Sequence, residues 1–128
     1  MASVLIVDDD KAVRQATQIL LSASGHDVVA VADGKSGINA VQDRQFDVVI
    51  VDLFMSGMNG LETMKAIRSI NQRVPIIAVS GFMFRGSCPG MPDFEVMAME
   101  AGATSTLYKP FRPNELLQRI QQSIALAA

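Results

Sequence analysis

Six residues with side chains suited to ionic and covalent chemistry stand just after short apolar runs of this 128-residue sequence. Carboxylates that lie close together repel each other unless a cation lies between them. Mg²⁺ is such a cation, and it typically binds one or two carboxylates together with waters and phosphate oxygens. The six residues, four acids with one hydroxyl and one ammonium group, are Asp8, Asp9, Asp10, Asp52, Ser80 and Lys109.

The same set contains the parts needed to accept a phosphoryl group. A carboxylate such as that of Asp52 is a nucleophile that can form an acyl phosphate. The ammonium group of Lys109 would neutralise charge on the transferred group, and the Ser80 hydroxyl could hydrogen-bond one of its oxygens. Asp10 has a simpler interpretation, because an aspartate directly before a helix commonly caps it.

The apolar runs themselves predict the strands that must position these residues. Runs of β-branched residues without polar alternation are typical of strands that are covered on both faces. Five such strands are expected, the last of them weaker, near residues 4–7, 28–31, 48–51, 76–79 and 104–108.

Helical spacing of apolar residues fills the intervals between the strands. One predicted helical face carries Val13, Ala16, Leu20 and Ala23, and Gly25 ends that helix. A later segment repeats the pattern with Leu61, Met64, Ile67 and Ile70. The last helix is expected to begin near Pro113 and to carry an apolar stripe of Leu116, Leu117, Ile120 and Ile124.

Alternation of strand and helix predicts an α/β domain with a parallel sheet and helices on both faces. In such a sheet ligands bind outside the carboxyl ends of the strands. Asp8, Asp9, Asp52, Ser80 and Lys109 would therefore meet at one edge.

Composition limits the function classes that remain. The length fits one domain over residues 1–128. Eleven basic residues against thirteen acidic ones give a net charge of −2, which argues against direct nucleic-acid binding. No apolar run approaches the roughly 20 residues of a membrane span, and no secretory signal is visible, so a cytoplasmic location is expected. The single cysteine, Cys88, predicts no internal disulfide.

Five segments together resemble the receiver domain of two-component response regulators, in its single-domain, chemotaxis-regulator-like form. The resemblance covers essentially the whole chain, and the segments occur in the family's order. They are residues 4–10, residues 47–53 with 57–62, residues 75–81, residues 101–103 and residues 109–111.

The resemblance implies a flavodoxin-like fold with strand order 2-1-3-4-5 and five helices. It implies that Asp52 accepts a phosphoryl group from a histidine kinase or phosphotransfer protein in a Mg²⁺-dependent step, which changes an output surface. By the same comparison, Asp9, Asp52 and the backbone carbonyl of Phe54 would bind Mg²⁺ directly, and Asp8 would act through a metal-bound water.

The remaining roles also come from the resemblance. Ser80 would hold a phosphoryl oxygen and carry the conformational signal, and Lys109 would pair with the phosphoryl group. The Lys109–Pro110 peptide bond is expected to be cis. The domain would assist its own phosphorylation and dephosphorylation without being an enzyme for another substrate.

The chain departs from the family pattern at several positions, among them Ser56, where Pro is common, and Phe54, where polar residues are common. Thr106 stands where the family usually has Tyr or Phe, and Tyr108 lies two residues later on the same face of the strand. The segment from Phe82 to Pro92 is longer than usual and is expected to form a loop. This loop could contact a downstream protein partner, or it could fold back on its own Phe and Met side chains.

The other polar residues receive ordinary structural interpretations. His26 follows Gly25 in a turn and is expected to be exposed. Five arginines are interpreted as parts of a solvated exterior: Arg14, Arg44, Arg68, Arg73 and Arg119.

Two alternatives to the phosphorylation switch remain. One is a receiver-like interaction module that works without phosphorylation, which Thr106 keeps open. The other is a haloacid-dehalogenase-like phosphatase, which needs a second carboxylate two positions after its nucleophile. After Asp52 that position is occupied by Phe54, so the pattern fails there. Asp8 and Asp10 are two positions apart, but Ala12 stands where the phosphatase pattern has Thr or Val.

Overall fold

A computed structural model of the chain describes residues 2–53, 60–81 and 94–127. Strands and helices alternate along this part of the chain, as the apolar runs predict. The elements are β1 (Ser3–Val7), α1 (Lys11–Ala23), β2 (Asp27–Val31), α2 (Gly34–Asp43), β3 (Val48–Asp52), α3 (Gly60–Ile70), β4 (Ile76–Gly81), α4 (Phe94–Glu100), β5 (Ser105–Lys109) and α5 (Pro113–Ala127).

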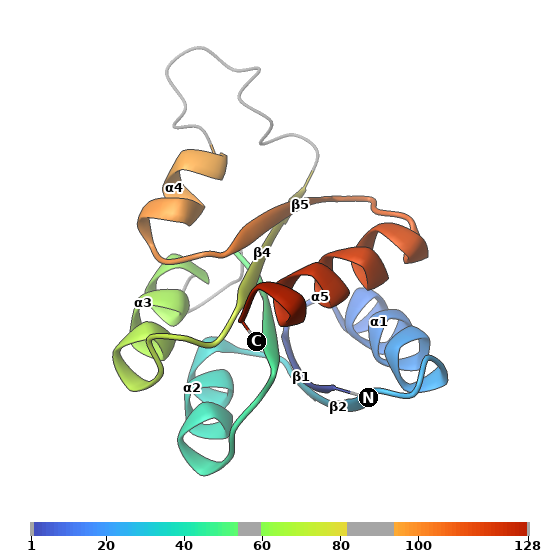
Figure 1. Cartoon of the computed structure of the whole chain (residues 1–128), viewed down its shortest axis with the longest axis horizontal. Coiled ribbons are helices and arrows are strands. Elements are labelled where there is room, and N and C mark those ends of the chain that lie inside the picture. The colour runs from blue at the N-terminus through green and yellow to red at the C-terminus, as the bar shows by residue number, and fades with distance from the viewer. Residues whose placement is uncertain (1, 54–59, 82–93, 128) are drawn as a thin grey trace.

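The five strands form one parallel sheet in the order β2-β1-β3-β4-β5 (Figure 1). β1 lies near the middle of the sheet, where residues 4–7 pair with residues 28–31 of β2 and with residues 48–51 of β3. The strand order and the parallel, doubly wound fold expected from the sequence are both confirmed.

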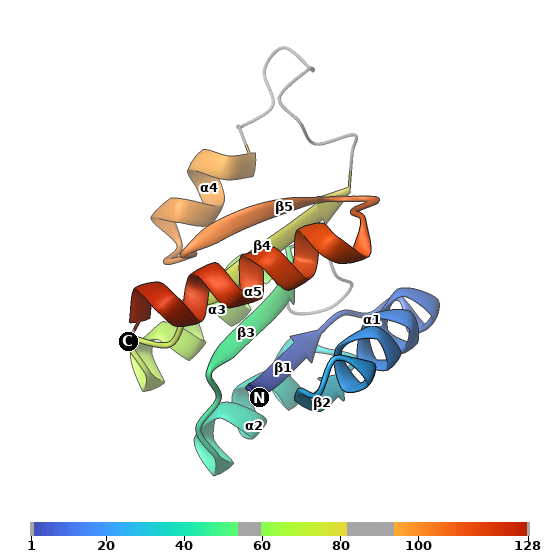
Figure 2. The ribbon, with the colours of Figure 1, turned by 45° about the vertical axis from the view of Figure 1, so that its right-hand side comes forward.

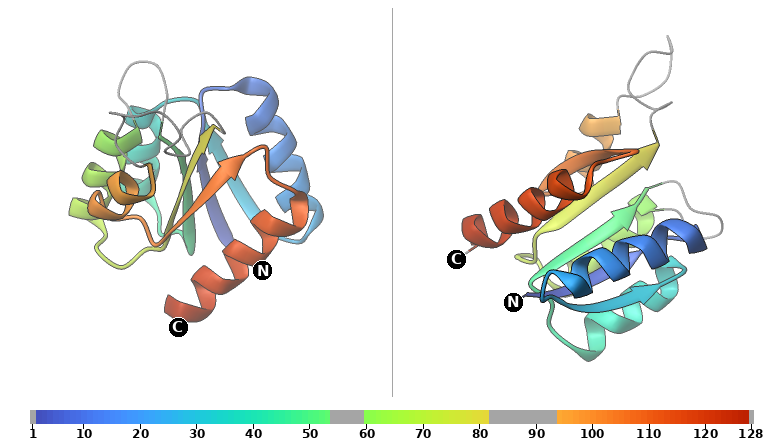
Figure 3. Two further views of the ribbon diagram at one scale, coloured as in Figure 1. Left: turned by 90° about the horizontal axis from the view of Figure 1, so that it is seen from above. Right: turned by 90° about the vertical axis from the view of Figure 1, so that its right-hand side faces the viewer.

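Helices cover both faces of the sheet (Figures 2 and 3). α1 and α5 lie on one face, where Leu21, Leu116 and Ile120 pack against β1, β3 and β4. α2, α3 and α4 lie on the other face, and their buried side chains include Met64, Ile67 and Phe94. Each face therefore has its own apolar core.

Burial along the strands follows their position in the sheet. Every residue of β3 is buried, because this strand has neighbours on both sides and helices on both faces. β2 lies at an edge, and four of its five residues are half-buried while the first is exposed. Continuous apolar runs therefore correctly predict the inner strands and overstate the burial of the edge strand.

The helix boundaries have local causes that the sequence reveals. The Asp10 carboxylate accepts hydrogen bonds from the backbone N–H groups of Ala12 and Val13, so the predicted cap of α1 is confirmed. Gly25, just after α1, has a φ of 89°, a conformation that favours glycine. α5 begins at Pro113, as predicted, and Glu115 accepts a hydrogen bond from the Arg112 N–H group.

Three details of the predicted helix faces and the fifth strand are wrong. In α1 the buried residues are Thr17 and Leu21, whereas Ala16 and Ala23 are exposed. Thr17 is buried because its hydroxyl donates to the Val13 carbonyl at 2.7 Å, which satisfies the polar group within the helix. Ile70, at the end of α3, is 40% exposed. The fifth strand begins at Ser105 and ends at Lys109, one residue later than expected at each end.

The two ends of the described chain lie close together at the amino-end edge of the sheet. Ala2, before β1, and Ile124 and Ala125, near the end of α5, line one shallow hollow of about 390 Å³ with His26 and Asp47.

Over the residues that the structure describes, no helix has the length and apolar character needed to cross a membrane.

Candidate functional site

The parallel sheet brings the predicted site residues to its carboxyl edge, because each of them lies near the carboxyl end of a strand or just after it. Asp8 directly follows β1, Asp52 is the last residue of β3, and Lys109 is the last residue of β5. On β4, Val79 pairs with Asp52 and Gly81 pairs with Lys109. Ser80 is the residue between these two pairing positions.

Three carboxylates form a cluster at this edge. Asp8, Asp9 and Asp52 each offer an oxygen, and these oxygens all lie within 4.8 Å of one another. Asp8 and Asp52 are only 5% and 8% exposed, whereas Asp9 is exposed. The Asp8 carboxylate is held by the backbone N–H of Asp10, which donates to it at 2.9 Å.

Lys109, at the end of the outer strand β5, reaches the carboxylates that follow β1 and end β3. Its Nζ atom lies 2.8 Å from Asp8 Oδ2 and 3.3 Å from Asp52 Oδ2. Burial lowers the pKa of Lys109, but the hydrogen bond to Asp8 and the charge of Asp52 outweigh burial, so its pKa is raised above the ordinary value. The lysine is therefore held in its charged form between two carboxylates.

The charges of the cluster fit a divalent cation. Three carboxylates outnumber the one ammonium group that is bonded to them, which leaves a negative charge in a small, partly buried space. The donors are all oxygens, which is the chemistry that Mg²⁺ prefers over softer metals. Phe54, whose carbonyl was predicted as a further ligand, lies outside the described residues.

Ser80 has a buried hydroxyl that is ready to take a new partner. The residue is 0% exposed, and its Oγ atom has no hydrogen-bond partner among the residues that the structure describes. A buried hydroxyl without a partner is energetically unfavourable.

The structure also shows where the chain departs from the family pattern. The Thr106 carbonyl accepts a hydrogen bond from Arg119 of α5 at 2.8 Å. The Tyr108 ring packs edge-on against Phe94, with ring centroids 5.1 Å apart and an interplanar angle of 63°. The Lys109–Pro110 bond is cis, as expected. The predicted loop from Phe82 to Pro92, with Cys88, lies outside the described residues.

Gly60 lies against the backbone of the site, a position that the sequence analysis did not predict. This first residue of α3 donates its N–H to the Leu53 carbonyl at 2.9 Å. A Cβ atom here would overlap the backbone carbonyl oxygen of Asp52 and the Cα of Leu53. Glycine is therefore required for α3 to begin against the end of the strand that carries Asp52.

Three of the five arginines are half-buried, which corrects the interpretation of all five as parts of a solvated exterior. Arg14 donates to the Asp8 carbonyl at 2.8 Å and so lies beside the acidic cluster. Arg119 ties α5 to β5 through Thr106. Arg68 is half-buried because its guanidinium group donates to the carbonyls of Gly102, Asn71 and Val74, and burial lowers its pKa.

His26 was expected to be exposed, and it is half-buried. Its Nδ1 atom accepts a hydrogen bond from the Ala2 N–H group at 3.1 Å, because β1 begins beside the turn that follows α1. The residue lies at the amino-end edge, away from the acidic cluster, and has a structural role there.

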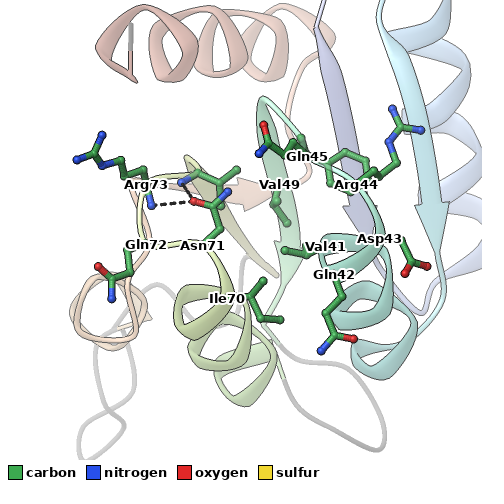
Figure 4. Close-up of a pocket in the computed structure, with 12 residues that line it drawn as sticks. Val41, Gln42, Asp43, Arg44, Gln45, Val49, Ile70, Asn71, Gln72 and Arg73 are labelled. Carbon is green, nitrogen blue, oxygen red and sulfur yellow. Dashed lines mark hydrogen bonds between the residues drawn. The ribbon is translucent and has the colours of Figure 1, made fainter.

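A hollow of about 580 Å³ lies between the ends of α2 and α3 (Figure 4). Its lining includes Val49, at the amino end of β3, and Asn71, which accepts hydrogen bonds from the N–H groups of Arg73 and Val74. None of the clustered carboxylates lines it. The hollow is therefore separate from the acidic site.

Comparisons with known proteins identify the family of the chain. The sequence model of the response regulator receiver domain family matches residues 4–121. The DNA-binding response regulator MtrA of Mycobacterium tuberculosis is 30% identical over 118 residues, which cover 92% of this chain and 48% of MtrA. The chain thus spans about half the length of the curated relatives that it matches.

Solved structures show the same fold. The chemotaxis protein CheY4 of Vibrio cholerae is 34% identical, with a TM-score of 0.84 and coverage of 96% of this chain and 98% of CheY4. The receiver domain of the sensor histidine kinase PA1611 of Pseudomonas aeruginosa is 25% identical, with a TM-score of 0.84 and coverage of 97% and 98%. That structure holds a magnesium ion in its active-site cleft.

Proposed function

We propose that this chain, which belongs to the response regulator receiver domain family, is a switch that accepts a phosphoryl group on Asp52. The observation that carries the proposal is the cluster of Asp8, Asp9 and Asp52, whose oxygens lie within 4.8 Å, with the Lys109 ammonium group bonded to two of them. In this proposal residues 1–128 form one receiver domain.

The proposed step is a transfer from a phosphohistidine to a carboxylate. One oxygen of Asp52 bonds to phosphorus while the bond between phosphorus and the donor nitrogen breaks. The electron pair of that bond stays with the donor imidazole. The proposed donor is a histidine kinase or a phosphotransfer protein, and the proposed location of the chain is the cytoplasm.

Each residue of the site has a part in this step. Lys109 faces Asp52 with its charge and would pair with the oxygens of the incoming group. The buried Ser80 hydroxyl would donate to a second phosphoryl oxygen. Gly60, which has no Cβ, lets α3 begin directly against the backbone of Asp52.

The proposed metal ligands are Asp9, Asp52 and the Phe54 carbonyl, with Asp8 acting through a water molecule. When bound, Mg²⁺ supplies positive charge that offsets the charge on the phosphoryl oxygens. The excess of carboxylates over the one bonded ammonium group in the cluster supports this assignment. In this proposal the chain assists its own phosphorylation and dephosphorylation and acts on no other substrate.

The test is phosphorylation of the whole chain by acetyl phosphate, with and without Mg²⁺. We expect Mg²⁺-dependent phosphoaspartate at residue 52, detected by the mass of the intact chain and located in a peptide digest. Asp52→Asn should abolish the signal, whereas Asp43→Asn, at an exposed position at the end of α2, should leave it unchanged.

The same assay distinguishes the alternatives. No phosphorylation of the wild type, by acetyl phosphate or by a phosphohistidine donor, would contradict the proposal and favour an interaction module that works without phosphorylation. Release of phosphate from small phosphate esters with repeated turnover would favour a phosphatase.

A further inference from the structure

Arg14 reaches back from the first turn of α1 to the short segment that carries two of the clustered acids. It is the fourth residue of that helix, and it is half-buried. Its Nη1 atom donates to the backbone carbonyl of Asp8 at 2.8 Å. This hydrogen bond therefore holds the main chain in place beside the acidic cluster.

The two peptide groups on either side of Asp9 are both held by hydrogen bonds. The group before it contains the Asp8 carbonyl, which accepts from Arg14. The group after it contains the Asp10 N–H, which donates to the Asp8 carboxylate at 2.9 Å. Asp9 is also the exposed member of the cluster, whereas Asp8 and Asp52 are buried. The direction of the Asp9 carboxylate is therefore set in part through the backbone, and Arg14 supplies one of the two bonds.

The sheet does not extend to the peptide group that leads into Asp9. β1 ends at Val7, the last of its residues to pair with β2 and β3, and the Asp8 N–H then donates to the Val31 carbonyl at 3.2 Å. Ordering the backbone of one residue costs free energy, and a ligand ordered in advance avoids this cost when it binds. The Arg14 bond provides such order before an ion is bound.

We infer that Arg14 is a positioning residue for the metal site, which orients Asp9 toward Mg²⁺ through the Asp8 carbonyl. The inference rests on the proposed function, because Asp9 is one of the proposed metal ligands, and it adds a residue of α1 to the site. The arginine has two opposing effects on the ion. Its positive charge repels a cation at the cluster, whereas its hydrogen bond prepares a ligand for that cation. In a positioning residue the second effect is the larger.

The test measures the Mg²⁺ affinity of the full chain by calorimetric titration. Arg14→Met removes the charge and the hydrogen bond, whereas Arg14→Lys keeps the charge and a donor. Lys11→Met is the matched control, because it removes a positive charge from an exposed position on the same turn of α1. Thermal unfolding and the amide NMR spectrum, both without Mg²⁺, establish that each variant is folded. Phosphoaspartate formation from acetyl phosphate is measured separately over a range of Mg²⁺ concentrations.

Arg14→Met should weaken Mg²⁺ binding by about tenfold, a loss typical of residues that orient a metal ligand. Lys11→Met should tighten binding by at most about fivefold, because an exposed charge contributes little. Arg14→Lys should recover most of the affinity that Arg14→Met loses. Phosphorylation of Arg14→Met should be slow at low Mg²⁺ and should approach the wild-type rate at saturating Mg²⁺, because the arginine acts through the metal site.

A folded Arg14→Met chain that binds Mg²⁺ as tightly as the wild type, or more tightly, would overturn the inference alone, since charge would then outweigh positioning. A rate that stays low at saturating Mg²⁺ would overturn it as well, because the arginine would then act on the phosphoryl group. If Arg14→Met does not fold, Arg14→Gln, which is shorter and also uncharged, makes the same comparison. A wild type that binds no Mg²⁺ and takes no phosphoryl group would overturn the proposed function, and this inference with it.

Discussion

Lys109 lies between two of the three clustered carboxylates and is bonded to both. Its ammonium group is 2.8 Å from Asp8 and 3.3 Å from Asp52, and these acids hold its pKa above the ordinary value. The lysine can therefore compensate for charge on an incoming phosphoryl group without first gaining a proton.

Replacing Lys109 by methionine should separate phosphoryl transfer from metal binding. A hydrogen bond to a charged group contributes about 1.5–3 kcal/mol, so phosphorylation of Asp52 should slow by roughly 10- to 100-fold. Mg²⁺ should bind at least as tightly, because a positive charge has left the cluster. Mass spectrometry measures the rate and calorimetric titration measures Mg²⁺ affinity. Lys65→Met, at an exposed position on α3, is the control. A parallel loss of Mg²⁺ affinity would contradict this prediction.

Gly60 gives a second prediction at the scale of one residue. In Gly60→Ala the new Cβ meets rigid backbone atoms of Asp52 and Leu53, so the start of α3 must move. We expect a loss of about 1–3 kcal/mol in the free energy of unfolding and slower phosphorylation of Asp52. Urea unfolding and the acetyl phosphate assay measure the two effects.

The comparison for Gly60 is Gly37→Ala in α2. There the three atoms nearest to the added Cβ all belong to the side chain of the buried Val7, the first of them at 2.8 Å. Phosphorylation by this variant should slow less than in Gly60→Ala, because the backbone of Asp52 is not displaced. Equal slowing in the two variants would show that the position of Gly60 beside Asp52 has no special importance.

Arg68 joins three elements, so its effect belongs to the scale of helices and strands. From α3 it donates to Val74 before β4 and, at 2.8 Å, to Gly102 in the turn between α4 and β5. Gly102 has a φ of 108°, and the Arg68 side chain occupies the space where a Cβ would lie. The arginine thus fixes the amino ends of β4 and β5 relative to α3.

Arg68→Met should lower the free energy of unfolding by about 2 kcal/mol, because it leaves partly buried carbonyls without donors. Arg73→Met, at an exposed position three residues after α3, should change it by less than about 0.5 kcal/mol. Urea unfolding of both variants makes the measurement. Equal values for the two would show that the hydrogen bonds of Arg68 are not needed for stability.

The accuracy of sequence-based prediction also differs among the elements. The inner strands could be predicted because continuous apolar runs reflect burial on both faces. The residues that follow these runs could then be placed together, because the carboxyl ends of parallel strands lie at one edge of the sheet. The face of α1 was wrong because Thr17 buries its hydroxyl by bonding to Val13 within the helix. Arg68 was misjudged because its partner Gly102 is 34 positions away in sequence. Local pattern shows which elements form, but it does not show which distant carbonyl a side chain will reach.

At the scale of the whole molecule, the charge of the acidic edge should make stability depend on Mg²⁺. An ion that binds only the folded chain stabilises it by about 2.7 kcal/mol at a concentration one hundred times its Kd. Adding Mg²⁺ should therefore raise the Tm, and removing it with EDTA should reverse the change. Asp9→Asn should lose most of this response and Asp43→Asn should keep it. A wild-type Tm that does not respond to Mg²⁺ would contradict the metal assignment.

The hollow lined by Ala2, Ile124 and Ala125 shows that the two chain ends lie near each other, at the edge of the sheet opposite the acidic cluster. This proximity makes the fold a candidate for circular permutation, since a short linker could join the old ends. New ends could then be opened in the turn between α3 and β4 without cutting a strand. Such a rearranged chain would order its strands differently in sequence and still bring the same aspartates together.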